Sequence, residues 1–328
     1  MNKIYIYLLF FVFLFLMMAI YFKIANKYNI IDKPNARSSH TLITVRGGGI
    51  IFPIAAFLHY FCFGSAHPWF LAGLLLISIV SFVDDIIELK GQIRLVFQFI
   101  AMAMLLLDFS LFNFPFYVYL PLLMLGVATI NAWNFMDGIN GITGGYSLLT
   151  LATLIYLKDQ VLGFASTGFT VAIALALLVF IFYNFRTQAR CFAGDVGSVS
   201  IAFIVVALMI KLVKTTENPN YILFILIYGL DSATTVFFRV LRKESILQPH
   251  RSHLYQYLAN EKGMPHNTVA MVYILIQLII NILVISFSFH STNTFIISLI
   301  VSVVIFVGVR FALEGSSRLL GRAPLIQD

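Results

Sequence analysis

Acidic side chains stand at points where apolar segments of the chain begin or end. Asp84 and Asp85 close one such segment, and Asp195 lies just before another, within the sequence FAGDVGS. Carboxylate oxygens are ligands that Mg²⁺ prefers, and a carboxylate can orient a nucleophile or remove its proton. Asp195 therefore predicts a magnesium site that handles an anionic group, and either a divalent cation or a nearby arginine would offset the charges of Asp84 and Asp85. The structural alternatives are a solvated helix end at Asp84 and Asp85 and an N-cap carboxylate at Asp195.

Polar side chains at a spacing of three residues give a second signal. Asn131, Asn134 and Asp137 recur near one face of an expected helix, and Gly138 and Asn140 follow them. Amides inside an apolar segment need hydrogen-bonding partners, and glycine lets the backbone approach a ligand closely. The pattern predicts one wall of a binding site. A hydrogen-bonded seam between helices, followed by a turn, is the alternative.

Basic residues occur in two further polar segments. Arg46 precedes three glycines, and His250, Arg251 and His253 lie in the sequence QPHRSHLYQ. Arginine and histidine donors suit phosphate oxygens, so we expect the second segment to bind phosphate groups. Three glycines at the start of a helix cost stability, and either close backbone packing or a phosphate contact would explain those after Arg46. A flexible glycine hinge and a solvated basic loop near anionic lipid are the alternatives. No cysteine or glutamate in the second segment completes a zinc site with its histidines.

The elements that must position these residues are membrane-spanning helices. Of the 328 residues, 60% are apolar and 11% are charged, whereas a soluble domain carries about 25% charged residues. This composition argues against a soluble enzyme, a disordered chain and a nucleic-acid-binding protein. Several segments approach the roughly 20 apolar residues that a bilayer core requires. The expected spans are Ile4–Phe22, Gly47–Phe63, Pro68–Val83, Leu95–Phe112, Phe116–Trp133, Thr143–Leu157, Phe164–Asn184, Ser198–Val213, Tyr221–Val240, Thr268–Phe289 and Thr294–Phe311.

These spans predict an all-α integral membrane protein that forms one polytopic domain over residues 1–328. A bundle of about eleven helices is expected, and ten is the alternative because some spans are short. The connections on one side carry 17 Lys and Arg residues and those on the other side carry 4. The positive-inside rule then places the N-terminus outside and the C-terminus in the cytoplasm, with all the candidate residues on the cytoplasmic face. Cys62 and Cys191 fall on opposite faces and are not expected to pair.

In this order, the motifs resemble those of the polyprenyl-phosphate N-acetylhexosamine-1-phosphate transferase family, which includes the phospho-N-acetylmuramoyl-pentapeptide translocase. The resemblance covers nearly the whole chain: PNxRxxH with RGGG, the DD pair, NxxNxxDG, FxGDxGS and HRxH. It implies a bundle of ten or eleven helices with a cytoplasmic catalytic cleft, in the bacterial inner membrane. The implied activity is transfer of a sugar 1-phosphate from a UDP-N-acetylhexosamine to undecaprenyl phosphate, with release of UMP. The implied cofactor is Mg²⁺, with Mn²⁺ as the alternative.

The resemblance and the chemistry together assign roles to particular residues. The catalytic acids are Asp84, Asp85 and Asp195, and the metal ligands are Asp195, Asp85 and Asn134. Phe192 is expected to stack on uracil, and the late basic residues are expected to hold the diphosphate. The full set expected to contact substrates is Arg46, Asn131, Asn134, Asp137, Gly138, Asn140, Phe192, His250, Arg251 and His253.

Some features depart from the family pattern or leave alternatives open. Ile43 and Val45 stand where many members have proline, and Asn140 stands where many have a second aspartate. The QPHRSHLYQ segment is most similar to the branch that initiates O-antigen, which handles N-acetylated 6-deoxyhexosamines.

A secondary transporter that uses deeper acids such as Asp231 and Asp108 is the main rival, and a lipid-binding protein without chemistry is a third hypothesis. The expected partners are the two substrates and membrane lipids, not nucleic acid, and a homodimer stays open.

Overall fold

A computed structural model describes residues 3–34, 42–64, 67–157, 167–245, 251–287 and 291–321. Almost all of its regular structure is helical. The elements are α1 (Lys3–Lys27), β1 (Ile31–Asp32), β2 (Thr44–Val45), η1 (Gly48–Ile50), α2 (Ile51–Phe63), α3 (Pro68–Ile86), α4 (Gly91–Asp108), η2 (Leu111–Asn113), α5 (Phe116–Met136), α6 (Ile142–Tyr156), α8 (Thr167–Asn184), α9 (Gly194–Thr216), η3 (Pro219–Ile225), α10 (Leu226–Leu241), α11 (Leu254–Asn260), α12 (His266–Ser286), α13 (Thr292–Glu314) and α14 (Ser316–Leu320).

The long helices have the length and composition of membrane spans. Among the described residues, nine helices are long and apolar enough to cross a bilayer, and two shorter apolar helices accompany them, Gly48–Phe63 and Ile142–Tyr156. Each of the eleven expected apolar spans coincides with one of these helices. The structure thus supports the predicted all-α integral membrane protein, while the number of crossings and their direction stay predictions.

Two helix boundaries differ from the expected spans in a way that matters for the candidate acids. Helix α3 continues past Val83 to Ile86, and α9 begins at Gly194 rather than at Ser198. A span counted from apolar residues ends at the first charge, whereas the backbone hydrogen bonds of a helix continue as long as the polar side chains find partners. Asp84 and Asp85 therefore lie in the last turn of α3, and Asp195 lies in the first turn of α9.

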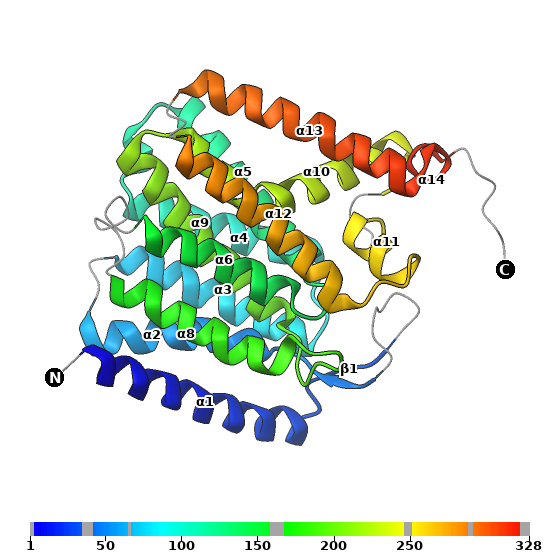
Figure 1. The fold of residues 1–328 in the computed structure, drawn as a ribbon. Coiled ribbons are helices and arrows are strands. Elements are labelled where there is room, and N and C mark those ends of the chain that lie inside the picture. The colour runs from blue at the N-terminus through cyan, green and yellow to red at the C-terminus, as the bar shows by residue number, and fades with distance from the viewer. Residues whose placement is uncertain are drawn as a thin grey trace.

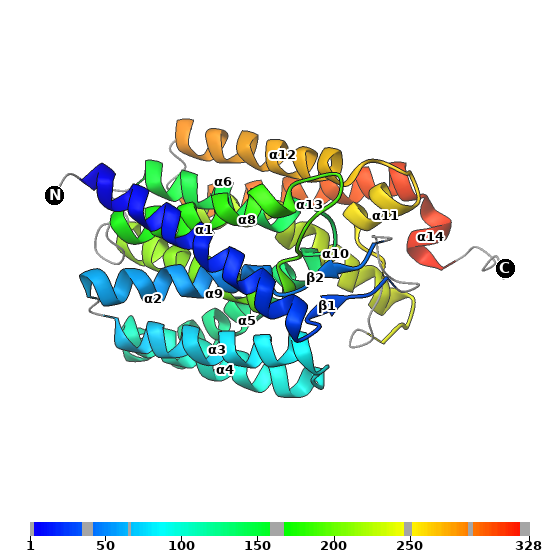
Figure 2. The same ribbon diagram turned by 90° about the horizontal axis from the view of Figure 1, so that it is seen from below.

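The helices run side by side between two ends of one bundle (Figures 1 and 2). Helix α1 starts at one end, and α14 lies at the other, together with α11 and the strands β1 and β2 (Figures 1 and 2). The two strands pair antiparallel, with Ile31 opposite Val45. We call the end with α11 and the strands the site end.

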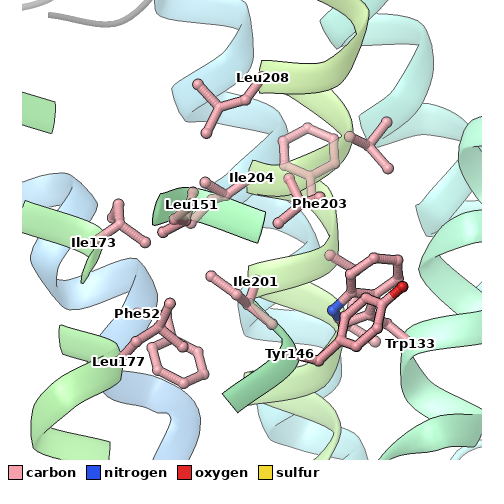
Figure 3. Close-up of a cluster of buried hydrophobic side chains, with 14 of the residues drawn as sticks. Phe52, Trp133, Tyr146, Leu151, Ile173, Leu177, Ile201, Phe203, Ile204 and Leu208 are labelled. Carbon is pink, nitrogen blue, oxygen red and sulfur yellow. The ribbon is translucent and has the colours of Figure 1, made fainter. Parts of the chain in front are cut away.

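Helix α9 forms the centre of the bundle. Its most apolar 18-residue stretch is 83% buried, whereas the corresponding stretch of α13 is only 6% buried and leaves an apolar surface for lipid. Ile201 and Ile204 of α9 face side chains from surrounding helices, among them Phe52 of α2 and Leu151 of α6 (Figure 3). Close van der Waals packing holds helices together inside a membrane. This packing makes α9 the most firmly fixed support for the residues at its N-terminus.

Candidate active site

The glycines after Arg46 bring two distant segments into direct backbone contact. The N–H groups of Gly48 and Gly49 donate to the carbonyls of Phe192 and Ala193, at 2.8 and 3.0 Å. A Cβ atom added at Gly49 would lie 2.2 Å from the Cα atom of Gly197, which only a shift of backbone could relieve. Close backbone packing therefore accounts for the glycines. It also fixes Arg46 beside the start of α9.

Asp85 anchors the N-terminus of α9. Its two carboxylate oxygens accept the backbone N–H groups of Asp195 and Val196, at 2.8 and 3.0 Å. The first N–H groups of a helix have no partner within the helix, so a carboxylate here satisfies two of them and opposes the positive end of the helix dipole. Arg46 donates its Nε to Asp85 Oδ1 at 2.7 Å, and the side chain of Asp85 is 0% exposed.

Asp195 and Asp84 face a common cation. Nη1 of Arg94 donates to Asp84 Oδ2 at 2.9 Å and to Asp195 Oδ2 at 3.3 Å. Nη2 of Arg46 lies 3.4 Å from the same Asp195 oxygen. We call Asp84, Asp85 and Asp195 the acid cluster. The two arginine side chains are 33% and 35% exposed and Asp195 is 16% exposed, so the cluster is open at its edge.

Asn134 joins the acid cluster, whereas Asn131 does not contact it through its amide. The Nδ2 of Asn134 donates to Asp195 Oδ1 at 2.6 Å and to Ser198 Oγ at 3.0 Å. The Nδ2 of Asn131 instead donates to Gln98 Oε1 of α4 at 2.6 Å and to the carbonyl of Val127. Three residues turn a helix by about 300°, so side chains at this spacing can face different neighbours. The alternative reading, a seam between helices, fits Asn131.

Asp137 has an unusual protonation equilibrium for an aspartate. Loss of hydration on burial raises its pKa to about 7, the negative charge of Asp195 adds to the rise, and a hydrogen bond with Thr143 opposes it. Near neutral pH this carboxyl is therefore present in both its protonated and ionised forms. It follows the last turn of α5, with its N–H 3.3 Å from the carbonyl of Asn134. Arg46, in contrast, has its pKa raised by Asp85 and Asp195 although burial opposes this, and it stays cationic.

The loop after Asp137 is held from two sides. Asn140 is buried, and its Nδ2 donates to the carbonyls of Arg186 and Thr187 at 2.9 and 3.3 Å. Gly138 lies against Tyr255 so closely that an added Cβ atom would be 2.2 Å from the Tyr255 hydroxyl oxygen. Within the described residues, the amide nitrogen of Asn140 therefore binds protein backbone. Phe192 is partly buried beside β2, and its N–H donates to the carbonyl of Val45 at 2.8 Å.

The late basic segment belongs to a second polar cluster. His253 is buried, and its Nδ1 lies 3.4 Å from Oδ1 of Asp231. Arg251 is partly buried, and its carbonyl accepts a hydrogen bond from Arg318 at 3.5 Å. His250 lies outside the described residues. The part of this segment that the structure describes is thus folded against the bundle rather than being a fully solvated loop.

Two contributors escaped the sequence reasoning, Arg94 and Gln98. Both lie in the first turns of α4, where an apolar span begins. A charge or an amide at the start of a span is costly unless it is paired, and that cost is the signal that would have indicated partners for them. Their partners could not have been named, because Asp84 and Asn131 lie on other helices.

No group of three or more His, Cys, Asp or Glu side chains in the described parts of the chain is arranged as a ready-made metal site. Mg²⁺ is commonly held by only one or two carboxylates together with substrate phosphates and water. Asp84 and Asp195 fit such a pair of carboxylate ligands, because their oxygens are close enough to share one cation. A single nitrogen of Arg94 lies within 3.3 Å of an oxygen of each. Asp85 meets it less well, because both of its oxygens accept backbone N–H groups.

Comparison with known proteins gives concordant matches. The family model described as glycosyl transferase family 4 matches residues 67–213, a range that includes the whole acid cluster. The chain is 27% identical over 286 residues to a probable undecaprenyl-phosphate N-acetylglucosaminyl 1-phosphate transferase of Bacillus subtilis, covering 79% of this chain and 78% of that protein. It is 30% identical over 263 residues to the undecaprenyl-phosphate alpha-N-acetylglucosaminyl 1-phosphate transferase of Salmonella typhi, covering 71% and 70%. The similar enzyme of Escherichia coli strain K12 is 28% identical over 276 residues, covering 74% and 73%.

Proposed function

The chain belongs to glycosyl transferase family 4, and from this membership and the acid cluster we propose that it transfers an N-acetylhexosamine 1-phosphate to undecaprenyl phosphate. The observation that carries the proposal is the meeting of Asp84 and Asp195 with two partly exposed arginines at one end of a membrane-spanning bundle. A lipid phosphate held at the membrane surface and a water-soluble donor can both reach such a site.

The proposed donor is a UDP-N-acetylhexosamine. An oxygen of the lipid phosphate attacks the phosphorus that carries the sugar, the bond from that phosphorus to the bridging oxygen breaks, and UMP leaves with the bridging oxygen. A phosphate monoester has its second pKa near 6 and is largely ionised at neutral pH, so the nucleophile needs little help from a base. The protein's task is mainly to position two anions and to offset their charges.

A divalent cation, Mg²⁺ or Mn²⁺, fits this chemistry because it neutralises charge on the diphosphate. We propose Asp195 and Asp84 as its ligands. This differs from the set expected from the sequence, Asp195, Asp85 and Asn134, because Asp85 is committed to the backbone of α9 and the Nδ2 of Asn134 donates to Asp195. In this proposal Asp85 and Asn134 hold Asp195 in place.

The two arginines have a separate role in the proposed reaction. Arg46 and Arg94 are each about one third exposed, so their guanidinium groups can reach a phosphate at the edge of the acid cluster. Guanidinium donors match phosphate oxygens in charge and geometry. We assign them to the acceptor phosphate, whereas the donor diphosphate lies between Asp195 and the segment that contains Arg251. Asp137 and the loop after it line the side of the site where the nucleotide binds.

The wider setting is also part of the proposal. The site end lies on the cytoplasmic side of a bacterial inner membrane, because the connections between helices at this end carry most of the Lys and Arg residues. The product begins a lipid-linked surface polysaccharide such as O-antigen. N-acetylated hexosamines and their 6-deoxy forms are the candidate sugars.

The test is a turnover assay with purified protein in detergent or nanodiscs. We expect UMP release from a panel of UDP-N-acetylhexosamines only when undecaprenyl phosphate and Mg²⁺ are both present. Asp195→Asn should abolish release. Asp108→Asn is the matched control, because Asp108 is also a buried acid but pairs with His67 in the connection before α3, away from the acid cluster. UMP release that needs no lipid, or sugar movement across a vesicle membrane without UMP, would contradict the proposal.

A further inference from the structure

Asp231 fixes the start of α11. It lies in α10 and is 0% exposed. Its oxygens accept the N–H groups of Leu254 and Tyr255, at 3.0 and 3.2 Å, and the hydroxyl of Tyr273 at 2.6 Å. A buried carboxylate is very costly unless it is fully hydrogen-bonded. If the first turn of α11 moved, the carboxylate of Asp231 would either become exposed or lose two of its hydrogen-bond donors.

The residues just before α11 are fixed in the same way. Nη2 of Arg310, in α13, donates to the carbonyl of Ser252 at 2.9 Å. Arg310 is almost fully buried and pairs with Glu314 at 2.6 Å. The main chain directly after Arg251 is therefore held by buried side chains from α10 and α13. These contacts place the segment relative to the outer helices of the bundle but not relative to the acid cluster.

Tyr255 supplies the missing connection. It is completely buried, and its hydroxyl donates to the carbonyl of Phe135 at 2.8 Å. Phe135 directly follows Asn134, whose amide donates to Asp195. The last carbonyls of a helix lack partners within the helix, so this hydroxyl satisfies one at the end of α5. The same ring packs against Gly138, where an added Cβ atom would lie 2.2 Å from the hydroxyl oxygen of Tyr255 and would force it to shift.

We propose that Tyr255 is a positioning residue that sets the distance between the Arg251 segment and the Asn134–Asp195 pair. The inference rests on the proposed function. The group that must fit between these two supports is the diphosphate of the nucleotide sugar. Loosening Tyr255 should therefore weaken donor binding, while the acceptor side, at Arg46 and Arg94, keeps its geometry.

The experiment compares Tyr255→Phe with Tyr257→Phe. The two tyrosines lie in the same short helix, and each hydroxyl donates to a backbone carbonyl at 2.8 Å. The partner of Tyr257 is Leu313 of α13, so its loss costs a similar hydrogen bond without touching α5. We expect Tyr255→Phe to raise the KM for the UDP-sugar about fivefold to tenfold, the effect of one lost hydrogen bond. The KM for undecaprenyl phosphate should stay within about twofold, and Tyr257→Phe should change neither by more than that.

A second readout does not depend on turnover. Amide hydrogen exchange of residues 137–141, measured without substrates, should be faster in Tyr255→Phe than in Tyr257→Phe, since only the former releases the loop. In Gly138→Ala the added Cβ atom would push the ring of Tyr255 away from Gly138, so this variant should raise the KM for the UDP-sugar as well.

Equal donor KM values in the two tyrosine variants would overturn the positioning role even if the wild-type protein is active. Exchange rates that do not differ would overturn the physical coupling on which it depends. A wild-type protein without turnover on UDP-sugars would overturn the proposed function, and the positioning role with it.

Discussion

Replacing Asp85 with asparagine tests whether this acid anchors α9. The carboxylate accepts two backbone N–H groups and the Nε of Arg46, all within 3.0 Å, and its side chain is 0% exposed. Asparagine keeps one oxygen, but its NH₂ group would face a donor. A hydrogen bond to a charged group contributes about 1.5–3 kcal/mol, and an unsatisfied buried donor adds to the loss. We therefore expect a destabilisation of about 3–4 kcal/mol.

Asp84→Asn is the matched control, since the two acids are neighbours in the last turn of α3. Asp84 accepts one backbone N–H, from Leu89 at 2.6 Å, and its side chain also contacts Arg94 and Asp195. Because Arg94 is 35% exposed, it can turn toward water when the charge is removed. We expect a loss of stability of only about 1–2 kcal/mol, although turnover should be lost in both variants.

The assay is the unfolding midpoint in a single detergent, followed by intrinsic fluorescence, with UMP release measured on the same preparations. The Asp85 variant should unfold at a clearly lower temperature than the Asp84 variant. Equal midpoints, or an Asp85 variant as stable as the wild type, would refute the assignment of Asp85 to the backbone of α9. That result would return Asp85 to the metal site expected from the sequence.

Three further predictions concern the surroundings of the acid cluster. Because the pKa of Asp137 is raised to about 7, its stabilisation is complete below its ordinary pKa and is lost as the pH rises through 7. Wild-type melting temperatures should therefore fall between pH 5 and 8 by more than those of Asp137→Asn. Gln98→Leu and Asn131→Leu should each be destabilising, because each leaves the other amide without its partner, and the double variant should lose less stability than the sum of the two single losses, as measured by a double-mutant cycle. Gly49→Ala should lower both the melting temperature and turnover, because its Cβ meets the backbone of Gly197 at 2.2 Å.

The helices could be predicted from the sequence because a bilayer requires long apolar segments, and these stand out from the polar connections. Their ends could not be predicted as well. Helix α1 runs to Lys27, five residues past the expected end at Phe22, because a helix can extend beyond the apolar core into the interface. The pairing of Val45 with Ile31 and with Cys191 joins segments far apart in the sequence, and no local pattern indicates it.

The candidate site was predictable in its members more than in their arrangement. Residue type and position identified Arg46, Asn134 and the acid cluster, and the structure brings these together. The sequence could not distinguish an acid that binds backbone from one that faces outward, since Asp84 and Asp85 are adjacent and chemically identical. That difference depends on which of the two carboxylates meets the N-terminus of α9, a helix that begins more than a hundred residues later.

The charges of the cluster explain why the proposed reaction needs more than these residues. When all three are ionised, three carboxylates and two guanidinium groups leave one net negative charge, partly offset by the positive end of the α9 dipole. Such a site attracts a cation, whereas both proposed substrates are anions. Bringing a lipid phosphate and a diphosphate together here therefore requires additional positive charge close to Asp84 and Asp195. In the proposed mechanism a divalent ion would supply it on one side and Arg251 on the other, and under that proposal the position of the Arg251 segment matters for the donor.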